Sequence, residues 1–434
     1  MNTDILVYGA APDGASDSTA AIQAAIDACA AAGGGRVSVP PGLFRTYTLH
    51  LKSHVELHLE AGAVLKGGDD PLGYPLFEPN AVWRVDRAPR LNRRALLYTL
   101  DQDDVAITGK GTIDGNAPRF HSFDPARGRI WRNSDTEITG RCVFFAGCRD
   151  VRLEDVTIRN PSGWSTWFLA CDRVTVRGVR ILCPPEFPNA DGIHLSASAD
   201  VVVSDCVVHS QDDAFVFRSH QEQLFAPRPL ERVVISNCVC STCCACFRFG
   251  WSGDWLVRDV SIDNVVCSTS WVGLAIVLPP LDPDHYLDPP RAPDLPLLPE
   301  EFRKPFELRC VRISNWSCVS TAESLQLAFG NARRTEPVAA VRDIALAHCR
   351  LEGRGHPVFV VRPENNVGGL RFDDVSFAVR PATPPKTVPA DSVWFDNCDD
   401  VSFDRCRWSV LPETSSPPLT GNGRKVFPGT RVFM

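Results

Sequence analysis

The second half of the chain repeats a nine-residue pattern in which apolar and polar positions alternate around one small polar residue. Alternation with a period of two is typical of a strand with one buried face, and the polar residue between two alternating runs predicts a turn. Successive copies begin about 23 to 33 residues apart, apart from one interval of about 51 residues. The copies read DVRLEDVTI from Asp150, RVTVRGVRI from Arg173, DVVVSDCVV from Asp200, RVVISNCVC from Arg232, DVSIDNVVC from Asp259, CVRISNWSC from Cys310, DIALAHCRL from Asp343, GLRFDDVSF from Gly369 and DVSFDRCRW from Asp400.

This spacing predicts a solenoid. No helical pattern separates one copy from the next, so the units are not strand–helix–strand crossovers. A coil of roughly 25 residues that holds two or three short strands, stacked many times, is a parallel β-helix. We therefore predict an all-β fold, a single-stranded parallel β-helix of about ten coils, with residues 1–434 forming one domain.

The two ends and one interior stretch depart from the repeat. From Thr19 to Ala32 the apolar residues fall at helical spacing and a run of glycines follows, which predicts a helix that caps the open end of the solenoid within the N-terminal region 1–50. Residues Leu278 to Glu301 are rich in proline, which cannot join a sheet, so we expect an insertion loop there. We expect residues 409–434 to form a C-terminal tail.

Composition and charge argue against nucleic-acid binding and against association with a membrane. Hydrophobic residues make up 44% and charged residues 22%, as in a packed globular protein. The net charge of −7 gives no basic field for nucleic acid or for an anionic membrane surface. No apolar run reaches the roughly 20 residues of a membrane span, and no leader peptide is visible. The 17 cysteines are not spaced as a disulfide framework, so we expect most of them to be reduced and buried, in a cytoplasmic protein.

Two segments resemble known families. YGAAPDGASDSTAAIQAAIDAC, followed by GGGRVSVPPG, resembles the beginning of the pectin-lyase-like right-handed β-helix. The stretch from GKGTIDGN (Gly109 to Asn116) through NPSGWSTW and PNADGIHLSAS to SQDDAFVFRS resembles the polygalacturonase family, glycoside hydrolase family 28. This resemblance covers roughly residues 5–280. It implies a right-handed solenoid and a cofactor-free, inverting glycosidase whose partner is a pectin-related or similar oligosaccharide.

The resemblance also implies roles for single residues. Asn189-Ala190-Asp191-Gly192 stands where the family has Asn-Thr-Asp-Gly, and Gln211-Asp212-Asp213 stands where it has Gly-Asp-Asp. Asp212 is then the general acid, Asp191 and Asp213 position and deprotonate the attacking water, and Asn189 and Gln211 contact the substrate.

Two further family motifs are missing. Cys244-Ala245-Cys246 replaces Gly-His-Gly, and Ala275 and Val277 occupy the positions of the Arg and Lys that grip a uronic-acid carboxylate in the family. We therefore expect subsites altered from those of a standard polygalacturonase, and polygalacturonic acid to be a poor substrate.

Strand alternation gives an independent register for the aspartates. It stacks Ile193, Phe215, Phe247 and Leu274 as inward residues on successive rungs, which places Asp191 and Asp213 one rung, or ~4.8 Å, apart. Carboxylates so crowded repel, and at least one pKa should rise, as general-acid catalysis requires. The alternative is that these aspartates only cap turns. By the separation rule, carboxylates this close suggest retention rather than the inversion of the family.

The same alternation predicts which side chains flank the aspartates. His194, Val216, Arg248 and Ala275 follow one another on the outward face, and Arg218 matches a family lysine that follows the paired aspartates. Arg218 or Arg248 can bind an acidic group through a planar fork, unless both belong to a solvated face. The substrate-binding candidates beside them are His194 and two tryptophans, Trp164 and Trp167, whose rings form either a sugar platform or buried packing.

Other chemistries remain as alternatives. Cys238, Cys240, Cys243, Cys244 and Cys246 suggest zinc, but repeat parity turns Cys238 and Cys240 into the core, so we predict no metal. A β-helix lyase with calcium in the aspartate cluster, a glycosyl transferase and an inactive glycan-binding solenoid are rival functions. A wall formed by the Pro-rich insertion, with His285 and Tyr286 reaching the sugar, would favour cleavage from chain ends; an oligomer contact or a disordered excursion is the alternative.

Overall fold

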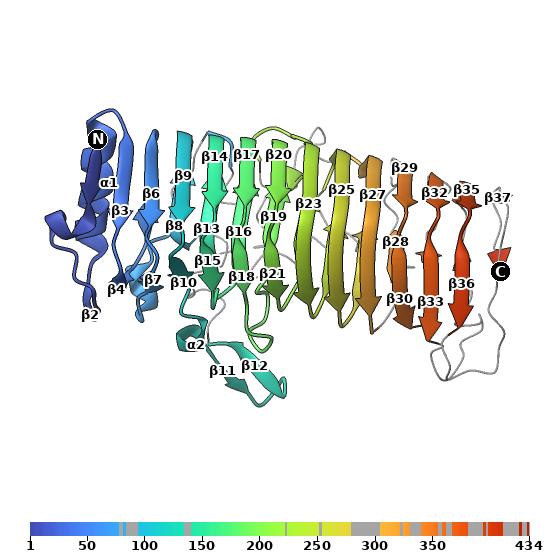
Figure 1. The fold of residues 1–434 in the computed structure, drawn as a ribbon, viewed down its shortest axis with the longest axis horizontal. Helices are drawn as coiled ribbons and strands as arrows, with labels where there is room; N and C mark the ends of the chain where they lie inside the picture. The colour runs from blue at the N-terminus through green and yellow to red at the C-terminus, as the bar shows by residue number, and fades with distance from the viewer. Residues whose placement is uncertain are drawn as a thin grey trace, which may run out of the picture.

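The computed structural model describes residues 1–77, 81–83, 94–133, 140–221, 224–250, 254–278, 304–321, 324–329, 340–354, 358–361, 367–380, 394–395, 398–410, 425–427 and 432–433. They form an elongated solenoid with the N- and C-termini at opposite ends (Figure 1). Parallel strands stack along its length in a 24-stranded and a 12-stranded sheet, and a separate two-stranded hairpin projects from its side. The fold is the predicted right-handed parallel β-helix.

The 24-stranded sheet is built from the repeat found in the sequence. Its strands are β1 (Asn2–Asp4), β2 (Asp13–Asp17), β3 (Gly35–Val39), β4 (Gly42–Thr46), β6 (Val55–Leu59), β7 (Ala63–Gly67), β9 (Asp103–Gly109), β10 (Thr112–Asp114), β14 (Arg149–Glu154), β15 (Thr157–Arg159), β17 (Asp172–Arg177), β18 (Arg180–Leu182), β20 (Ala199–Ser204), β21 (Val207–Ser210), β23 (Leu230–Thr242), β25 (Leu256–Thr269), β27 (Glu307–Ser320), β29 (Ala340–Ala347), β30 (Arg350–Arg354), β32 (Val367–Asp373), β33 (Ser376–Arg380), β35 (Cys398–Asp404), β36 (Arg407–Val410) and the antiparallel β37 (Lys425–Phe427).

The 12-stranded sheet contributes one strand to each coil. Its strands are β5 (Leu49–His50), β8 (Ala95–Leu100), β13 (Arg141–Ala146), β16 (Trp164–Leu169), β19 (Ile193–Ser196), β22 (Phe215–Arg218), β24 (Ala245–Phe249), β26 (Val272–Leu278), β28 (Leu325–Phe329), β31 (Val358–Val361), β34 (Trp394–Phe395) and β38 (Val432–Phe433). All but β38 pair in parallel, so the described residues hold eleven coils, close to the number expected. The hairpin is β11 (His121–Asp124) with β12 (Arg129–Arg132), after the short helix α2 (Ala117–Phe120).

The polar residue inside each repeat forms the predicted bend. Asp205, Asn237, Asn264 and Asn315 all have φ between 50° and 57°, in the left-handed region. Asp and Asn tolerate this conformation better than other residues with a Cβ, because their short side chains bond locally to the backbone. The bend lets one repeat turn the chain without breaking the register of its neighbours.

Apolar side chains from the 24-stranded and the 12-stranded sheet fill the interior in a continuous core. Helix α1 (Thr19–Ala31) closes the N-terminal end as predicted, and buries Ile22, Ala25, Ile26 and Cys29. Short 3-10 turns at Ile5–Tyr8 and Pro71–Gly73 complete this region. The described cysteines are free thiols and most of them are buried, as the sequence predicted.

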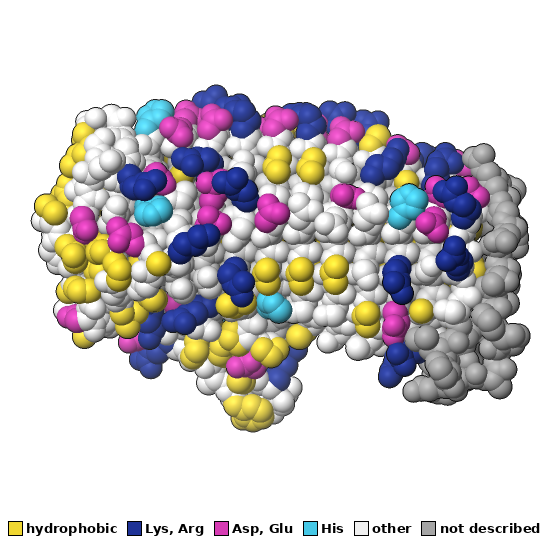
Figure 2. Space-filling view, viewed as in Figure 1, with side chains coloured by type: hydrophobic (Ala, Val, Ile, Leu, Met, Phe, Trp, Pro, Cys, Tyr) yellow, Lys and Arg dark blue, Asp and Glu magenta, His cyan; other side chains and the backbone are white. Residues whose placement is uncertain are grey.

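Charged side chains gather on the outer turns. Asp103 pairs with Arg149, Asp150 with Arg173, and Asp200 with Arg232, each pair joining neighbouring coils. Figure 2 shows acidic and basic side chains following one another along one long edge of the solenoid. Each of these exposed pairs adds little stability. Their regular placement sets an acidic side chain of one coil beside a basic side chain of the next.

Two predicted segments lie largely outside the described residues. These are the Pro-rich insertion, with His285 and Tyr286, and most of the C-terminal tail 409–434. Within the described part of the chain, no helix has the length and apolar character needed to cross a bilayer.

Candidate active site

The predicted aspartates meet at the turns that lead into β19 and β22. Ile193 pairs with Phe215, so Asp191 and Asp213 stand on neighbouring rungs, as strand alternation predicted. The backbone N–H of Gly192 donates to the carbonyl of Asp213 over 2.9 Å, which fixes the two turns against each other. A Cβ on Gly192 would lie 2.3 Å from the carbonyl oxygen of Ala214, so only glycine fits beside Asp191.

Asp212 is the accessible member of the group. It is partly exposed, whereas Asp191 and Asp213 are buried. Burial and the adjacent charge of Asp213 raise the pKa of Asp212, with the Cys244 thiol and Arg248 acting in the opposite direction. A partly exposed carboxyl with a raised pKa can act as a general acid.

Asp191 is buried, and its carboxyl is held by His194. His194 Nε2 lies 2.8 Å from Asp191 Oδ2. Burial is the main cause that raises the pKa of Asp191, and Asp212 and Asp213 add to it. Burial and nearby arginines lower the pKa of His194, so its ring is neutral. A neutral imidazole and a carboxyl can share a hydrogen bond without a buried charge pair.

Asp213 has a different partner. Its Oδ2 accepts from Arg248 Nε over 3.0 Å, and its Oδ1 accepts from the backbone N–H of Ala245 over 3.0 Å. Burial opposes the charge of Arg248, but Asp213 outweighs this and raises its pKa. The guanidinium also lies over the ring of Trp271, 5.0 Å from its centroid. The adjacent carboxyls of Asp212 and Asp213 therefore sit in unlike surroundings.

Asn189 connects the general-acid candidate to the hairpin. Its Nδ2 donates to Asp212 Oδ2 over 3.1 Å, and its Oδ1 accepts from Arg132 Nη1 over 2.7 Å. Its φ is 57°, which asparagine tolerates. Gln211 is partly exposed beside Asp212, and its backbone N–H donates to the carbonyl of Ala190. Both residues lie next to Asp212, and their contact with a substrate stays a prediction of the resemblance.

Trp164 is the centre of a stacked group. The ring of His194 lies 3.6 Å from the Trp164 ring, centroid to centroid, and nearly parallel to it. The guanidinium of Arg141, from the preceding rung, lies 3.4 Å from the same indole centroid. Trp164 is partly exposed, but its faces are used by these contacts. It therefore positions His194, and through it Asp191.

Four of the predicted substrate contacts are corrected by burial. Trp167 is fully buried because Phe144 and Trp83 pack against it, and its Nε1 donates to Ser196 Oγ, so it cannot be a sugar platform. Arg218 is buried against the carboxylate of Asp254, not exposed on an outer face. His194 and Arg248 are likewise buried and contact aspartates of the site.

Different side chains stand where the two family motifs are missing. Cys244, which stands at the first glycine of the family's Gly-His-Gly, brings its Sγ within 4.8 Å of carboxylate oxygens of Asp212 and Asp213. Burial and both carboxylates raise the pKa of this thiol, so it stays protonated and can donate to them. Ala275 is buried beside Arg248 and offers no charge. The side chain of Val277 lies outside the described residues.

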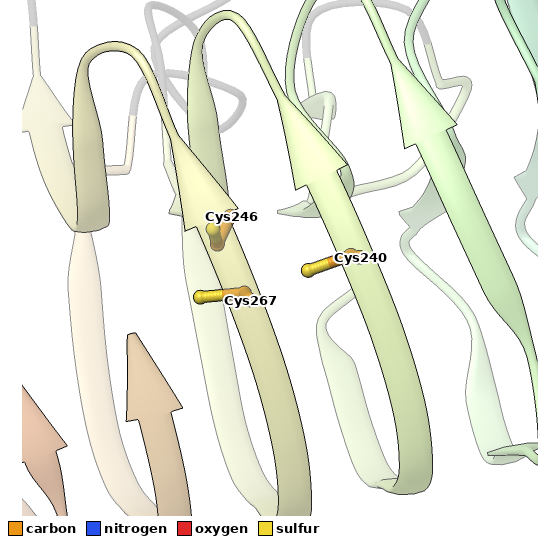
Figure 3. A group of neighbouring side chains, drawn as sticks. All are labelled: Cys240, Cys246 and Cys267. Carbon is orange, nitrogen blue, oxygen red and sulfur yellow. The ribbon is translucent and has the colours of Figure 1, made fainter. Parts of the chain in front are cut away.

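A second group of thiols lies inside the solenoid, away from the aspartates. The sulfurs of Cys240, Cys246 and Cys267 lie within 4.8 Å of one another (Figure 3). Cys240 and Cys267 are rung neighbours in the core, and Trp316 donates to Cys267 over 3.1 Å. The sequence grouped Cys238 with Cys240, but Cys238 is stacked over Cys206 instead. All three sulfurs belong to residues of the continuous apolar core, which is where repeat parity placed Cys240.

Sequence reasoning missed three contributors to the site. Arg132 reaches Asn189 from the hairpin, Arg141 contacts Trp164 from the preceding rung, and Asp254 binds Arg218. In the sequence, only the basic run RGRIWR pointed to one of these residues, Arg132. The position at which a hairpin contacts the solenoid depends on turns, and strand alternation does not encode them.

Comparisons with known proteins place the chain near one family. Residues 90–276 match the model for glycosyl hydrolases family 28. A probable polygalacturonase of Vitis vinifera is 26% identical over 287 residues, 63% of this chain and 56% of the relative. An exo-poly-alpha-D-galacturonosidase of Dickeya chrysanthemi is 30% identical over 261 residues, 51% of this chain and 42% of the relative. The matches thus span about half the length of these relatives.

Solved structures share the fold along the chain. A family 28 exopolygalacturonase of Yersinia enterocolitica superposes with a TM-score of 0.68 at 19% identity, covering 96% of this chain and 76% of the other. A hyperthermoactive exopolygalacturonase of Thermotoga maritima gives 0.68 at 18% identity, with 100% and 95% covered. At these identities the likeness concerns the architecture.

Proposed function

We propose that the chain is a glycoside hydrolase acting on a pectin-related oligosaccharide, on the premise that residues 90–276 match the model for glycosyl hydrolases family 28. The observation that carries the proposal is Asp212, a partly exposed carboxyl whose pKa is raised by burial and by Asp213. It is the group that can deliver a proton to a glycosidic oxygen.

In this mechanism Asp212 protonates the leaving oxygen while a water attacks the anomeric carbon. Asp213, held by Arg248 and by the Ala245 N–H, accepts the proton of that water. Asp191, fixed by His194, orients the water. We propose inversion, in line with the family, so that no glycosyl-enzyme bond forms.

We further propose release from chain ends. Two relatives are named for such activity: the exo-poly-alpha-D-galacturonosidase of Dickeya chrysanthemi and an exopolygalacturonase of Zea mays. The hairpin contacts the site at Asn189, through Arg132, and this contact supports an obstruction to a polymer on that side.

The test is product analysis on a panel of glycans that includes oligogalacturonides. New reducing ends should appear, with monomer or dimer from the earliest times, and proton NMR should show the inverted anomer first. An unsaturated product absorbing in the ultraviolet would instead identify a lyase. Glycan binding without any product would identify an inactive binding solenoid.

A further inference from the structure

The hairpin of β11 and β12 carries a cluster of cations beside the active site. Figure 1 shows it projecting from the side of the solenoid. The guanidinium carbons of Arg127, Arg129 and Arg132 lie 5.0, 4.5 and 4.9 Å from the centroid of the Trp131 ring. Like charges gathered around one ring repel one another, and an anion bound among them would relieve this repulsion.

The three arginines are not equivalent. Arg127 is paired with Asp124 on the same hairpin. Arg129 is exposed, and among the described residues no carboxylate forms an ion pair with it. Arg132 is partly exposed and donates to Asn189 Oδ1. The hairpin therefore holds Arg132 against Asn189 and carries Arg129 exposed over the same Trp131 ring, while the charge of Arg127 is met by Asp124.

The link to the reacting bond is short. Arg132 binds Asn189, and Asn189 binds Asp212 Oδ2, so one side chain separates this guanidinium from the general acid. A ligand group beside Arg132 is then within one sugar unit of the bond to be cleaved. Arg218 and Arg248, the cations predicted from the sequence, are buried on Asp254 and Asp213.

We propose that Arg132, with Arg129, forms a subsite for the carboxylate of a uronic-acid residue next to the scissile bond. A planar guanidinium fork matches the two oxygens of a carboxylate. The subsite supplies, from a projecting hairpin, the positive charge that Ala275 does not supply from the sheet. This inference rests on the proposed function, and it makes the preferred substrate an acidic oligosaccharide rather than a neutral one.

The test compares trigalacturonate with its methyl ester, which has the same shape without the charge. For the wild type, the acid should be the better substrate. Arg132→Gln and Arg129→Gln should raise KM for the acid about tenfold or more, the worth of a charge-assisted contact, and leave KM for the ester nearly unchanged. Arg132→Lys should restore part of the loss. Arg173→Gln, far from the hairpin in an outer-turn pair with Asp150, is the matched control.

The outcomes separate the two proposals. If acid and ester lose activity equally in Arg132→Gln, Arg132 only positions Asn189 and the subsite is wrong. If the wild type hydrolyses the acid and neither glutamine variant changes KM, the subsite is also wrong while the hydrolase stands. If the wild type cleaves neither compound, the hydrolase fails; calorimetric binding of trigalacturonate then decides the subsite, which requires tighter binding than the ester and loss in Arg132→Gln.

Discussion

Asp213 and Arg248 form a buried ion pair across neighbouring rungs, with 3.0 Å between Oδ2 and Nε. Asp212, one residue earlier, faces the Asn189 amide instead. Two consecutive residues of one turn thus have different surroundings. Asp213 is paired with a buried arginine, whereas Asp212 has a raised pKa. Acid and base roles in a hydrolase need this kind of divergence between two carboxyls.

Replacing Asp212 by Asn should abolish hydrolysis while preserving the fold. The amide keeps the shape but cannot donate a proton at the acidity needed, so kcat should fall about a thousandfold or more. Steady-state kinetics and a thermal melt check both parts. Asp205→Asn, the same change at an outer bend where asparagine also tolerates the left-handed φ of 57°, should leave kcat unchanged. Near-normal activity in Asp212→Asn would show that Asp212 is not the general acid.

The pH dependence of kcat/KM should report Asp212. Because a general acid acts in its protonated form, activity should fall as pH rises through the raised pKa of this carboxyl. Arg248 lowers that pKa, so Arg248→Gln should move the high-pH limb to higher pH, whatever it does to the maximum rate. A limb that stays in place, or moves down, would contradict the assignment.

Asp191 should destabilise the folded protein at neutral pH. Its pKa is raised in the folded state, mainly by burial, above the ordinary value of 3.8. The unfolded chain therefore loses the proton first, and stability present below about pH 4 is lost as pH rises through the folded pKa. At pH 7, Asp191→Asn should melt at a higher temperature than the wild type, with a free energy of unfolding larger by on the order of 1 kcal/mol, whereas at pH 3 the two proteins should melt at the same temperature. An equal difference at both pH values would refute this origin.

Cys243 should be the first described cysteine to react with Ellman's reagent. It is the exposed one, whereas most others are buried. Burial of its neighbourhood and Asp212 raise its pKa, so its labelling should accelerate with rising pH. Cys243→Ser should remove the fast phase, and the thiols of Cys240, Cys246 and Cys267 should appear only on unfolding. Fast labelling that persists in Cys243→Ser would show that the core opens readily.

Much of the fold could be predicted because the repeat encodes both strands and bends. Period-two alternation fixes which side chains point inward, and the Asp or Asn between the runs fixes where the chain turns. The stacking of Phe215 on Phe247 and of Asp191 beside Asp213 followed directly. Cys206 and Cys238 fell at one repeat position for the same reason.

The rest of the site depends on parts that break the repeat. Trp167 is buried because Trp83 packs against it from a segment with no alternation, so strand parity could only mark it as outward. Arg218 faces outward as expected, but Asp254, which lies between β24 and β25 in the sequence, neutralises it. Sequence spacing predicts whether a side chain of a strand points inward or outward. It does not predict which other segment packs over an outward side chain.

The stacked rungs give the molecule a direction of mechanical weakness. In a parallel solenoid the hydrogen bonds between coils run along the long axis, evenly spaced from one rung to the next. Tension along that axis loads successive rungs in series, so coils should peel away singly instead of shearing together. Each freed coil of roughly 27 residues would lengthen the chain by about 90 Å, which would give a sawtooth of nearly equal steps under an optical tweezer.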